Sequence, residues 1–341
     1  MKSPILLPQD QFRERTLARD KHKCVVCGSP VNEVHHLLES RLFDCGGHYL
    51  DNGATLCQDH RLASETTAIS VEELRKHAKI ERVVIPGHFY NDERYDRWGN
   101  QVLPNGTRLR GELFQDESVQ KVLSLGDALR LFSWWVKYPR TMHLPWSQGI
   151  TSDDRILLSL AHFLGLEVVV TEKFDGENTT IYSDYLHARS LDGVSHPSRD
   201  WVKNFSSKFA YSLPEGWRLC GENLFARHSI GYDNLDSYFY GFSLWDDTNT
   251  CLGWDETLEY FEILGVKPVR EIWRGVFDEK AIKALYDPEK DWGRCEGYVV
   301  RLAGSFHYRD FRKAVAKFVR QGHVQTDDHW MKGQITPNLL A

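Results

Sequence analysis

The sequence predicts an α+β fold rich in antiparallel strands, preceded by a small module built around paired cysteines. Three observations predict it. Short runs with strand character alternate with helical runs through the second half of the chain. Four cysteines fall between residues 24 and 57, while the other three are scattered. The 341 residues, 41% hydrophobic and 26% charged, are enough for two globular parts.

The N-terminal part has two helical runs and a turn-rich segment. Residues 9–20 have helical character, and residues 70–80 form an amphipathic helix with Ser70 as N-cap and Glu73 at the capping-box position. Residues 86–111 are rich in Gly, Pro and Asn, which predicts loops and short hairpin strands. We therefore expect a module over 1–85, a linker and hairpin region over 86–117, and a second domain over 118–341.

The second domain mixes helices and strands. Its expected strands are 166–173, 179–185, 217–222, 238–245 and 295–302. Its expected helices are 118–136, 153–164, 255–264 and 278–286. This mixture is typical of an antiparallel-rich α+β domain.

Composition excludes several classes of protein. No apolar run approaches the roughly 18 residues of a spanning helix, and the Pro-broken start does not resemble a signal peptide. We therefore expect a soluble, intracellular, cytoplasmic protein with no membrane partner. The net charge of −6 argues against coating of nucleic acid by bulk positive charge. Seven cysteines, four of them clustered, favour metal binding over disulfides.

The clustered cysteines have the spacing of a metal site. Cys24-x-x-Cys27 and Cys57-x-x-His60 are two chelating pairs, and together they supply three thiolates and one imidazole for a tetrahedral Zn²⁺. Cys45-x-x-His48 is a third pair of the same form. We rank it lower because one Zn²⁺ needs only four ligands.

Residues 20–64 resemble the HNH family. The resemblance rests on the Cys-x-x-Cys knuckle, on His35-His36 and on Asn52 ahead of the last helix. It implies a zinc-binding ββα module. In an active nuclease of this kind His35 would hold a catalytic metal, His36 would activate water and Asn52 would orient it.

One position departs from the HNH pattern. Arg61 follows His60, so the usual last metal-binding His is missing unless His60 serves there. Two interpretations follow: a live nuclease, or a structural knuckle that docks nucleic acid or the second domain. We favour the structural one.

A lysine with suggestive neighbours follows the apolar run 166–170. Lys173-Phe174-Asp175-Gly176 places an amine at the end of a buried strand, where desolvation and nearby cations can lower a lysine pKa enough for attack on phosphorus. Gly176 lets the backbone pass close to a ligand. Alone, the pattern also fits an exposed hairpin turn.

Further motifs in order make the chain similar to the covalent nucleotidyltransferases, which comprise polynucleotide ligases and mRNA capping enzymes. The segments that resemble this family's motifs are Glu172–Asn178, Leu186–Ser190, Leu219–Glu222, Tyr238–Trp245, Glu296–Arg301 and Ala316–Arg320. The resemblance covers about residues 120–330. It implies a nucleotidyltransferase fold of the RNA ligase, ATP-grasp-like type.

The resemblance also implies a role for each matched residue. Lys173 would be the nucleophile, and Glu296 would help to hold a divalent cation. The nucleotide would be bound by Glu172 at the adenine, Arg189 at phosphate or ribose, Glu222 at ribose or a metal-bound water, Phe242 or Tyr240 stacked on the base, and Lys317 at the α-phosphate.

The last matched segment departs from the family pattern. RNA ligases usually carry Lys-x-Lys there, whereas this chain has Lys317 followed by Phe318, Val319 and Arg320. Whether Arg320 replaces the second Lys stays open. Residues 301–320 hold six basic residues against Asp310 alone, which we interpret as a strip that faces phosphate. The segment Lys137–His143 resembles the stretch before the lysine motif in RNA ligases.

The length of the segment after Arg320 distinguishes RNA ligases from DNA ligases and capping enzymes. DNA ligases and capping enzymes place an OB domain after the last motif, and the 21 residues after Arg320 are too few for one. The chain therefore resembles RNA ligases, with no C-terminal OB domain expected. We expect an ATP-dependent enzyme that seals 5′-phosphate and 3′-hydroxyl RNA ends through lysyl-AMP, with Mg²⁺ or Mn²⁺ and a structural Zn²⁺. RNA, including RNA/DNA hybrid ends, is the expected partner.

Three alternatives to this function stay open. The first is an HNH-type nuclease, the second is a composite enzyme that cuts and reseals, and the third is a non-enzymatic RNA-end sensor. The presence of Lys173, Glu222 and Glu296 argues against the sensor.

Overall fold

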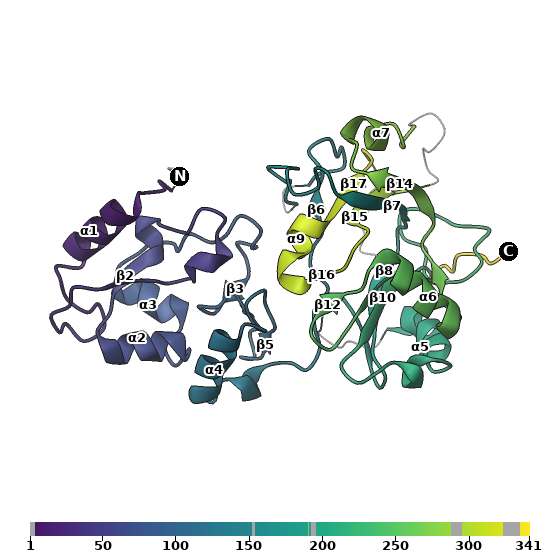
Figure 1. Cartoon of the computed structure of the whole chain (residues 1–341). Coiled ribbons are helices and arrows are strands. Elements are labelled where there is room, and N and C mark those ends of the chain that lie inside the picture. Colours follow the sequence, from purple (N-terminus) through teal and green to yellow (C-terminus); the bar gives the residue numbers. More distant parts are fainter. Residues whose placement is uncertain (1–3, 152–153, 190, 192–195, 288–294, 323–334) are drawn as a thin grey trace. The chain divides into compact units, whose positions relative to one another are not determined.

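The computed structural model describes residues 4–151, 154–189, 191, 196–287, 295–322 and 335–341. It divides into two compact units, 1–136 and 137–341 (Figure 1). Both units mix helices with mostly antiparallel strands. Within the described residues, none of the helices has the length and apolar character needed to cross a membrane.

The first unit contains a β-hairpin that is followed by a helix. Strands β1 (Val34–His36) and β2 (Gly53–Thr55) pair antiparallel, and helix α2 (Gln58–Glu65) follows directly, which gives a ββα arrangement. The remaining elements are α1 (Gln9–Arg19), η1 (Ser40–Leu42), η2 (Leu50–Asn52), α3 (Val71–His77), β3 (Arg94–Tyr95), β4 (Gln101–Val102), β5 (Arg108–Leu109), α4 (Glu117–Leu125) and η3 (Leu129–Leu131).

Two sequence predictions for this unit are confirmed. Helix α3 starts with the full capping box: Glu73 N donates to Ser70 Oγ at 3.2 Å, and Ser70 N donates to Glu73 Oε2 at 2.8 Å. Residues 86–111 form loops and the small sheet β3-β4-β5.

The division between the units lies after residue 136, whereas the sequence analysis began the second domain at 118. Val119 and Leu123 of α4 are completely buried in one cluster with Leu42, Phe43 and Trp98. Burying such side chains is worth roughly 1.5–3 kcal/mol each, so this core attaches α4 to the first unit. The helix expected over 118–136 also ends early, at Leu125, and only η3 follows it.

The second unit is built on two sheets. The larger has the order β16-β12-β11-β10-β8-β9 with β13 beside β11, and the smaller has the order β14-β7-β15-β17-β6. The strands are β6 (Met142–His143), β7 (Glu167–Lys173), β8 (Glu177–Ile181), β9 (Leu186–Ala188), β10 (Arg218–Asn223), β11 (Phe239–Trp245), β12 (Thr250–Cys251), β13 (Lys267–Pro268), β14 (Glu271–Val276), β15 (Gly297–Leu302), β16 (Phe306–His307) and β17 (Val315–Val319).

Helices complete the second unit. They are α5 (Asp200–Ser206), α6 (Trp254–Leu264), α7 (Glu279–Lys283) and α9 (Phe311–Ala314), with the short η4 (Pro197–Arg199), η5 (Ala210–Ser212) and η6 (Tyr308–Asp310). Residues of α5 and α6 share a core with the larger sheet, through Val202 and Phe261 packed with Leu219 and Phe239. The expected strands 166–173, 217–222, 238–245 and 295–302 and the helices 255–264 and 278–286 are confirmed within a few residues.

The helix expected over 153–164 is wrong for the described part of that range. His143 N donates to Arg155 O and Leu157 N donates to His143 O, so residues 155–157 extend alongside β6. Non-local pairing with β6 therefore wins over a local helical pattern of apolar residues.

Alternation along the smaller sheet decides which side chains meet the larger one. In the register of β7, β15 and β17, Thr171 lies opposite Val299, and Val299 lies opposite Lys317. These residues share one face of the sheet because side chains alternate along a strand. Val168, Val170, Tyr298 and Val300 lie on the other face and form a buried core.

Candidate active site

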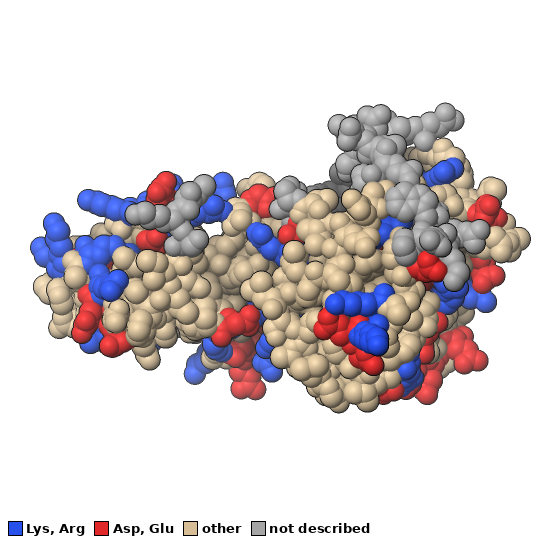
Figure 2. Space-filling model, turned by 90° about the horizontal axis from the view of Figure 1, so that it is seen from above, with Lys and Arg blue, Asp and Glu red and all other residues tan. Residues whose placement is uncertain are grey.

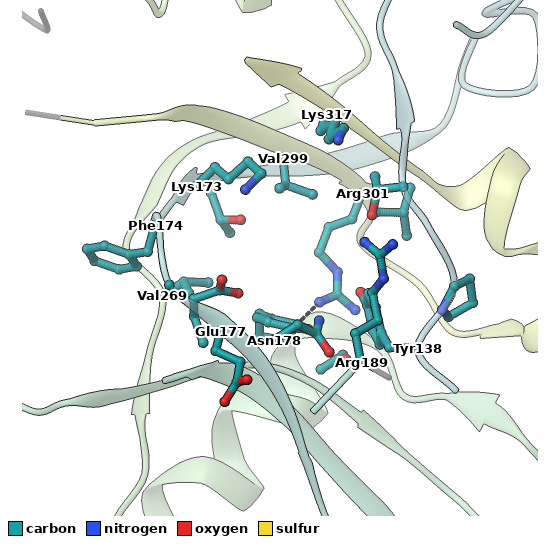
Figure 3. Close-up of a pocket in the computed structure, with 18 of the residues that line it drawn as sticks. Tyr138, Lys173, Phe174, Glu177, Asn178, Arg189, Val269, Val299, Arg301 and Lys317 are labelled. Carbon is teal, nitrogen blue, oxygen red and sulfur yellow. Dashed lines mark hydrogen bonds between the residues drawn. The ribbon is translucent and has the colours of Figure 1, made fainter. Parts of the chain in front are cut away.

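A cavity of about 730 Å³ lies between the two sheets of the second unit. Both sheets contribute to its walls, through Thr171, Lys173, Val299 and Lys317 from the smaller and Phe242 from the larger. Figure 3 shows Lys173, Val299 and Lys317 on one side of it and Asn178 and Arg189 on the other. The sequence-predicted residues Lys173, Glu172, Arg189, Glu222, Phe242 and Lys317 all line this one cavity.

Lys173 lies where the chain crosses from one sheet to the other. It ends β7, and the turn 174–176 leads directly into β8. Gly176 is required by packing within the protein, because a Cβ there would lie 2.6 Å from Asn223 O of β10. Close packing against β10 therefore requires glycine here, and Gly176 also lines the cavity, as the sequence suggested.

Carboxylates surround the Lys173 amine. Lys173 Nζ donates to Glu296 Oε2 at 2.5 Å, and Glu296 is 6% exposed. Register explains the contact, because Lys173 lies opposite Gly297 in the β7–β15 pair. A Cβ on Gly297 would lie 2.0 Å from Phe318 O, so only glycine lets β15 lie this close to β17 beside Glu296.

This charge arrangement sets the protonation state of the free site. Burial alone would lower the pKa of Lys173, but the charges of Glu296, Glu222 and Asp175 outweigh burial and raise it. Burial raises the pKa of Glu222 to about 8, and the neighbouring carboxylates of Glu296 and Asp175 add to this shift. Lys173 is therefore an ammonium ion at neutral pH, contrary to a lysine activated by desolvation.

Two hydrogen bonds hold Asp175 in place. Its carboxylate accepts a hydrogen bond from Ile230 N at 2.8 Å, and its backbone N–H donates to Tyr232 Oη at 2.9 Å. Burial and Glu296 raise the pKa of Asp175. Three carboxyl groups thus crowd one buried region, which is favourable for a hard divalent cation with oxygen ligands.

The aromatic residues of β11 have different surroundings. Phe242 lines the cavity and packs edge-on against Tyr138, with ring centroids 5.2 Å apart. Tyr240 stacks on Phe174 at 4.8 Å, and its hydroxyl accepts from Asp236 N at 3.0 Å. Tyr240 does not line the cavity. Of the two aromatic candidates, only Phe242 is therefore in reach of a ligand there.

Two predicted residues differ in detail from expectation, and the position of the expected second lysine holds a valine. Glu172 lines the cavity, but its carboxylate pairs with Arg270 at 3.0 Å. Arg320 is completely buried and donates to Cys295 O at 2.9 Å, so it does not replace a second lysine of the motif. Alternation puts Val319, two residues after Lys317, at the position that lysine would occupy.

The basic run 301–320 does not form a single strip. Arg301 and Lys317 line the cavity, whereas Arg309 and Lys313 lie 3.6 and 3.7 Å from the half-buried Asp310. Arg301 donates to Phe242 O and to Cys251 Sγ. Arg301 therefore connects β15 to β11.

Sequence reasoning missed several cavity residues. Arg199 forms a two-bond ion pair with Glu177, at 2.8 and 2.5 Å. His228 and Asn178 also line the cavity, and Asn178 Oδ1 is buried without a hydrogen-bond partner among the described residues. Asn178 stood inside the quoted lysine motif, but Arg199 and His228 come from segments with no recognisable pattern.

The first unit brings the predicted cysteine cluster together. The ligand atoms of Cys24, Cys27, Cys57 and His60 lie within 4.8 Å of one another. Cys57 Sγ is 3.0 Å from His60 Nδ1, and Cys27 Sγ is 3.8 Å from Cys57 Sγ. Three thiols and one imidazole at this spacing fit a tetrahedral metal. Cys45 lies apart from the cluster, 3.4 Å from Tyr49 Oη.

The other nuclease-like candidates are engaged by their own unit. Asn52 is completely buried, accepts from Leu38 N at 2.9 Å and donates to Leu38 O and Gly47 O at 3.1 Å each. His36 stacks on Phe12 at 4.8 Å, next to His48. Burial lowers the pKa of His36 to about 4.

Two further side chains near the hairpin lie beside carboxylates of the same unit. His35 Nε2 lies 3.7 Å from Glu33, and Arg61 donates to Glu65 at 2.9 Å.

A comparison with protein families gave a match within the second unit. Residues 166–319, from β7 to β17, match the family described as RNA ligase. The matched region includes Lys173, Glu222, Glu296 and Lys317. A search of curated proteins gave no match.

The solved structures with partial likeness to this chain include ligases. An archaeal ATP-dependent RNA ligase is 18% identical with a TM-score of 0.37, over 55% of this chain and 48% of that one. A Naegleria gruberi RNA ligase mutant with ATP and Mn has the same identity and TM-score, over 55% and 58%. A putative ATP-dependent DNA ligase from Aquifex aeolicus is 19% identical with a TM-score of 0.35, over 55% and 50%. The chain spans about half the length of these proteins.

Proposed function

We propose that the chain is an ATP-dependent RNA ligase that joins 5′-phosphate and 3′-hydroxyl ends. One observation carries the proposal: Lys173 reaches into a nucleotide-sized cavity at the junction of two sheets, inside the region that matches the RNA ligase family. The cavity also presents the cations Arg189 and Lys317. A primary amine, carboxylates and cations in one cavity suit transfer of a nucleotidyl group.

The first step forms a lysine-linked nucleotide. Lys173 Nζ attacks the α-phosphorus of ATP, the N–P bond forms, and the bond from this phosphorus to the bridging oxygen of pyrophosphate breaks. The AMP then passes to a 5′-phosphate end, and a 3′-hydroxyl displaces it. Each displacement depends on positioning and on charge opposite the phosphates more than on acid–base catalysis.

Lys173 has to lose a proton before it attacks. The nearest acceptor is Glu296 Oε2, at 2.5 Å, and Glu222 and Asp175 complete the carboxylate group. Mg²⁺ or Mn²⁺, bound by these carboxylates and by ATP, would supply positive charge at the transferring phosphate. Pairing of Glu296 and Glu222 with a cation would also remove the charges that raise the Lys173 pKa.

The rest of the cavity suits an adenine nucleotide. Phe242 and Val299 present an aromatic ring and a branched apolar side chain from opposite sheets, between which a flat base can lie. Arg189 and Lys317 supply donors to phosphate oxygens. Glu172, held by Arg270, is placed at the adenine end through the β7 backbone rather than through a free carboxylate.

For the first unit we propose a structural Zn²⁺ at Cys24, Cys27, Cys57 and His60. An HNH-type nuclease, alone or combined with the ligase, is the second candidate, and the ββα hairpin that carries His35 and His36 favours it. One observation weighs against it: the Asn52 amide is committed to backbone groups of Leu38 and Gly47.

A role in RNA docking fits the surface of this unit. Lys and Arg side chains gather at the end of the unit that carries α1 (Figure 2). Arg13, Arg15, Lys21 and Lys23 are exposed there, close to the acids Asp10 and Glu14. Such a cluster suits phosphate contacts whose strength falls with salt.

Strand sealing tests the proposal. Single-stranded, nicked and hairpin substrates, with RNA or DNA on each side of the break, would be incubated with ATP and Mg²⁺. We expect sealing of RNA ends by the full chain and none by Lys173→Ala. Cleavage that is lost in His36→Ala, without sealing, would instead support the nuclease.

A further inference from the structure

Lys317 is held from outside the cavity by a residue that no motif contains. Its Nζ lies 3.5 Å from Asp154 Oδ1. The same carboxylate oxygen lies 3.1 Å from His143 Nε2. Asp154 comes from the extended segment beside β6, and His143 is opposite Lys317 in the parallel β6–β17 pair.

The Asp154 carboxylate is fixed on its other side. Its Oδ2 accepts from Thr151 N at 3.1 Å and from Thr151 Oγ1 at 2.9 Å. His143 is 1% exposed, and its Nδ1 lies 2.7 Å from Ser147 Oγ. A carboxylate that contacts two residues at defined positions can serve as a rigid support for the Lys317 amine.

The negative charge of Asp154 affects the protonation of Lys317. Burial and the nearby charge of Lys173 lower the pKa of Lys317, while Asp154 and Glu296 oppose this. Burial would raise the pKa of Asp154, but the close contact with His143 and the charge of Lys317 reverse this and lower it. Asp154 is therefore ionised at neutral pH, and its charge favours the protonated form of a lysine that lies beside a second lysine.

We propose that Asp154 is the positioning residue of Lys317 in the adenylylation reaction. It holds the Lys317 ammonium at the cavity wall before ATP binds. At 3.5 Å the contact is long enough for Nζ to turn to a phosphate oxygen while the Thr151 and His143 contacts stay in place. This role rests on the proposed ligase function, because it gives Lys317 a phosphate to contact.

A double-mutant cycle separates positioning from simple structural support. The rate of AMP–protein formation would be measured over a range of ATP concentrations for the full chain, Asp154→Asn, Lys317→Ala and the double variant. We expect Asp154→Asn to lower the rate about tenfold, or about 1.4 kcal/mol in the barrier. In the Lys317→Ala background we expect less than a twofold change from Asp154→Asn.

A matched control comes from the same unit. Asp310 also lies beside a lysine, 3.7 Å from Lys313, but outside the cavity. Asp310→Asn should leave the adenylylation rate unchanged. An equal loss from Asp154→Asn with and without Lys317 would overturn the proposal, as would no loss in either background.

A second measurement does not depend on ligase activity. The Lys317 amine would be titrated by NMR after isotopic labelling of lysine, in the full chain, in Asp154→Asn and in Asp310→Asn. We expect the Lys317 pKa to fall in Asp154→Asn only, and an unchanged pKa would overturn the proposal. Should Asp154→Asn not fold, Asp154→Glu takes its place, with a smaller fall expected.

The two measurements distinguish failure of the proposed function from failure of the proposed role of Asp154. If the unaltered chain forms no AMP adduct, the proposed function fails, and the Lys317 titration still decides whether Asp154 holds this lysine.

Discussion

The Cys–His cluster of the first unit and the lysine cavity of the second are both sites that short sequence motifs predicted, but their polar atoms are committed differently. Around the cluster, the Asn52 amide is taken up by backbone partners and His36 packs against Phe12. In the cavity, Lys173 and Lys317 face an open volume. The difference teaches that a motif brings residues together, whereas a cavity beside them decides whether they can reach a substrate.

The largest expected effect tests the structural side of this comparison. Cys57→Ser, or removal of the metal by a chelator, should unfold the first unit, because structural Zn²⁺ contributes about 10–16 kcal/mol to the folding of small zinc modules. Metal analysis of the full chain should give about one Zn per chain. Far-UV circular dichroism and limited proteolysis would follow the loss. A first unit that stays folded without metal would remove the structural role.

The next effect tests the chemical side. Glu296→Gln removes the partner of Lys173 and one proposed cation ligand, so the rate of AMP transfer to the protein should fall at least about 100-fold, which corresponds to about 2.7 kcal/mol. Glu177→Gln, which breaks an ion pair with Arg199 at the same cavity, serves as the matched control and should cost less. An equal loss in both variants would show that Glu296 has no special place in the reaction.

Glu222 gives a prediction about pH. Its folded-state pKa, about 8, is above its ordinary value, so the folded state binds more protons than the unfolded state between these two pKa values. The stability from this group is present at low pH and is lost as pH rises through about 8. Glu222→Gln should therefore raise the melting temperature of the nucleotide-free protein at pH 8 and change it little at pH 5. The opposite trend would contradict the burial of this carboxyl group.

The smallest expected effect separates the two aromatic residues of β11. Phe242→Leu should raise KM for ATP about tenfold with little change in melting temperature, because base–aromatic stacking is worth about 1–3 kcal/mol. Tyr240→Leu should instead lower the melting temperature, because it loses the Phe174 stacking and the bond from Asp236 N, and leave KM nearly unchanged. Reversed effects would exchange their roles.

Much of this arrangement could be predicted from the sequence. Alternating and β-branched runs located β7, β10, β11 and β15, because strands buried on one or both faces require such patterns. Paired spacing located the metal cluster, since each pair bites from one tight turn. Ser70 and Glu73 marked a helix start through a purely local hydrogen-bond pattern.

The rest depends on non-local contacts. The spacing of apolar residues in 153–164 is typical of a helix, but residues 155–157 pair with β6 instead. The approach of Asp154 to Lys317 could therefore not be predicted from the sequence. The choice between Tyr240 and Phe242 depended on Phe174 and Asp236, which pack beside the strand. The commitment of Asn52 to the backbone of Leu38 and Gly47 could not be read from its motif at all.

Covalent labelling tests the central claim most directly. The full chain would be incubated with ATP and Mg²⁺, digested, and mapped by mass spectrometry. We predict one AMP linked to Lys173, absent from Lys173→Ala and unaffected by His36→Ala. No adduct, an adduct on another residue, or one that persists in Lys173→Ala would contradict the account.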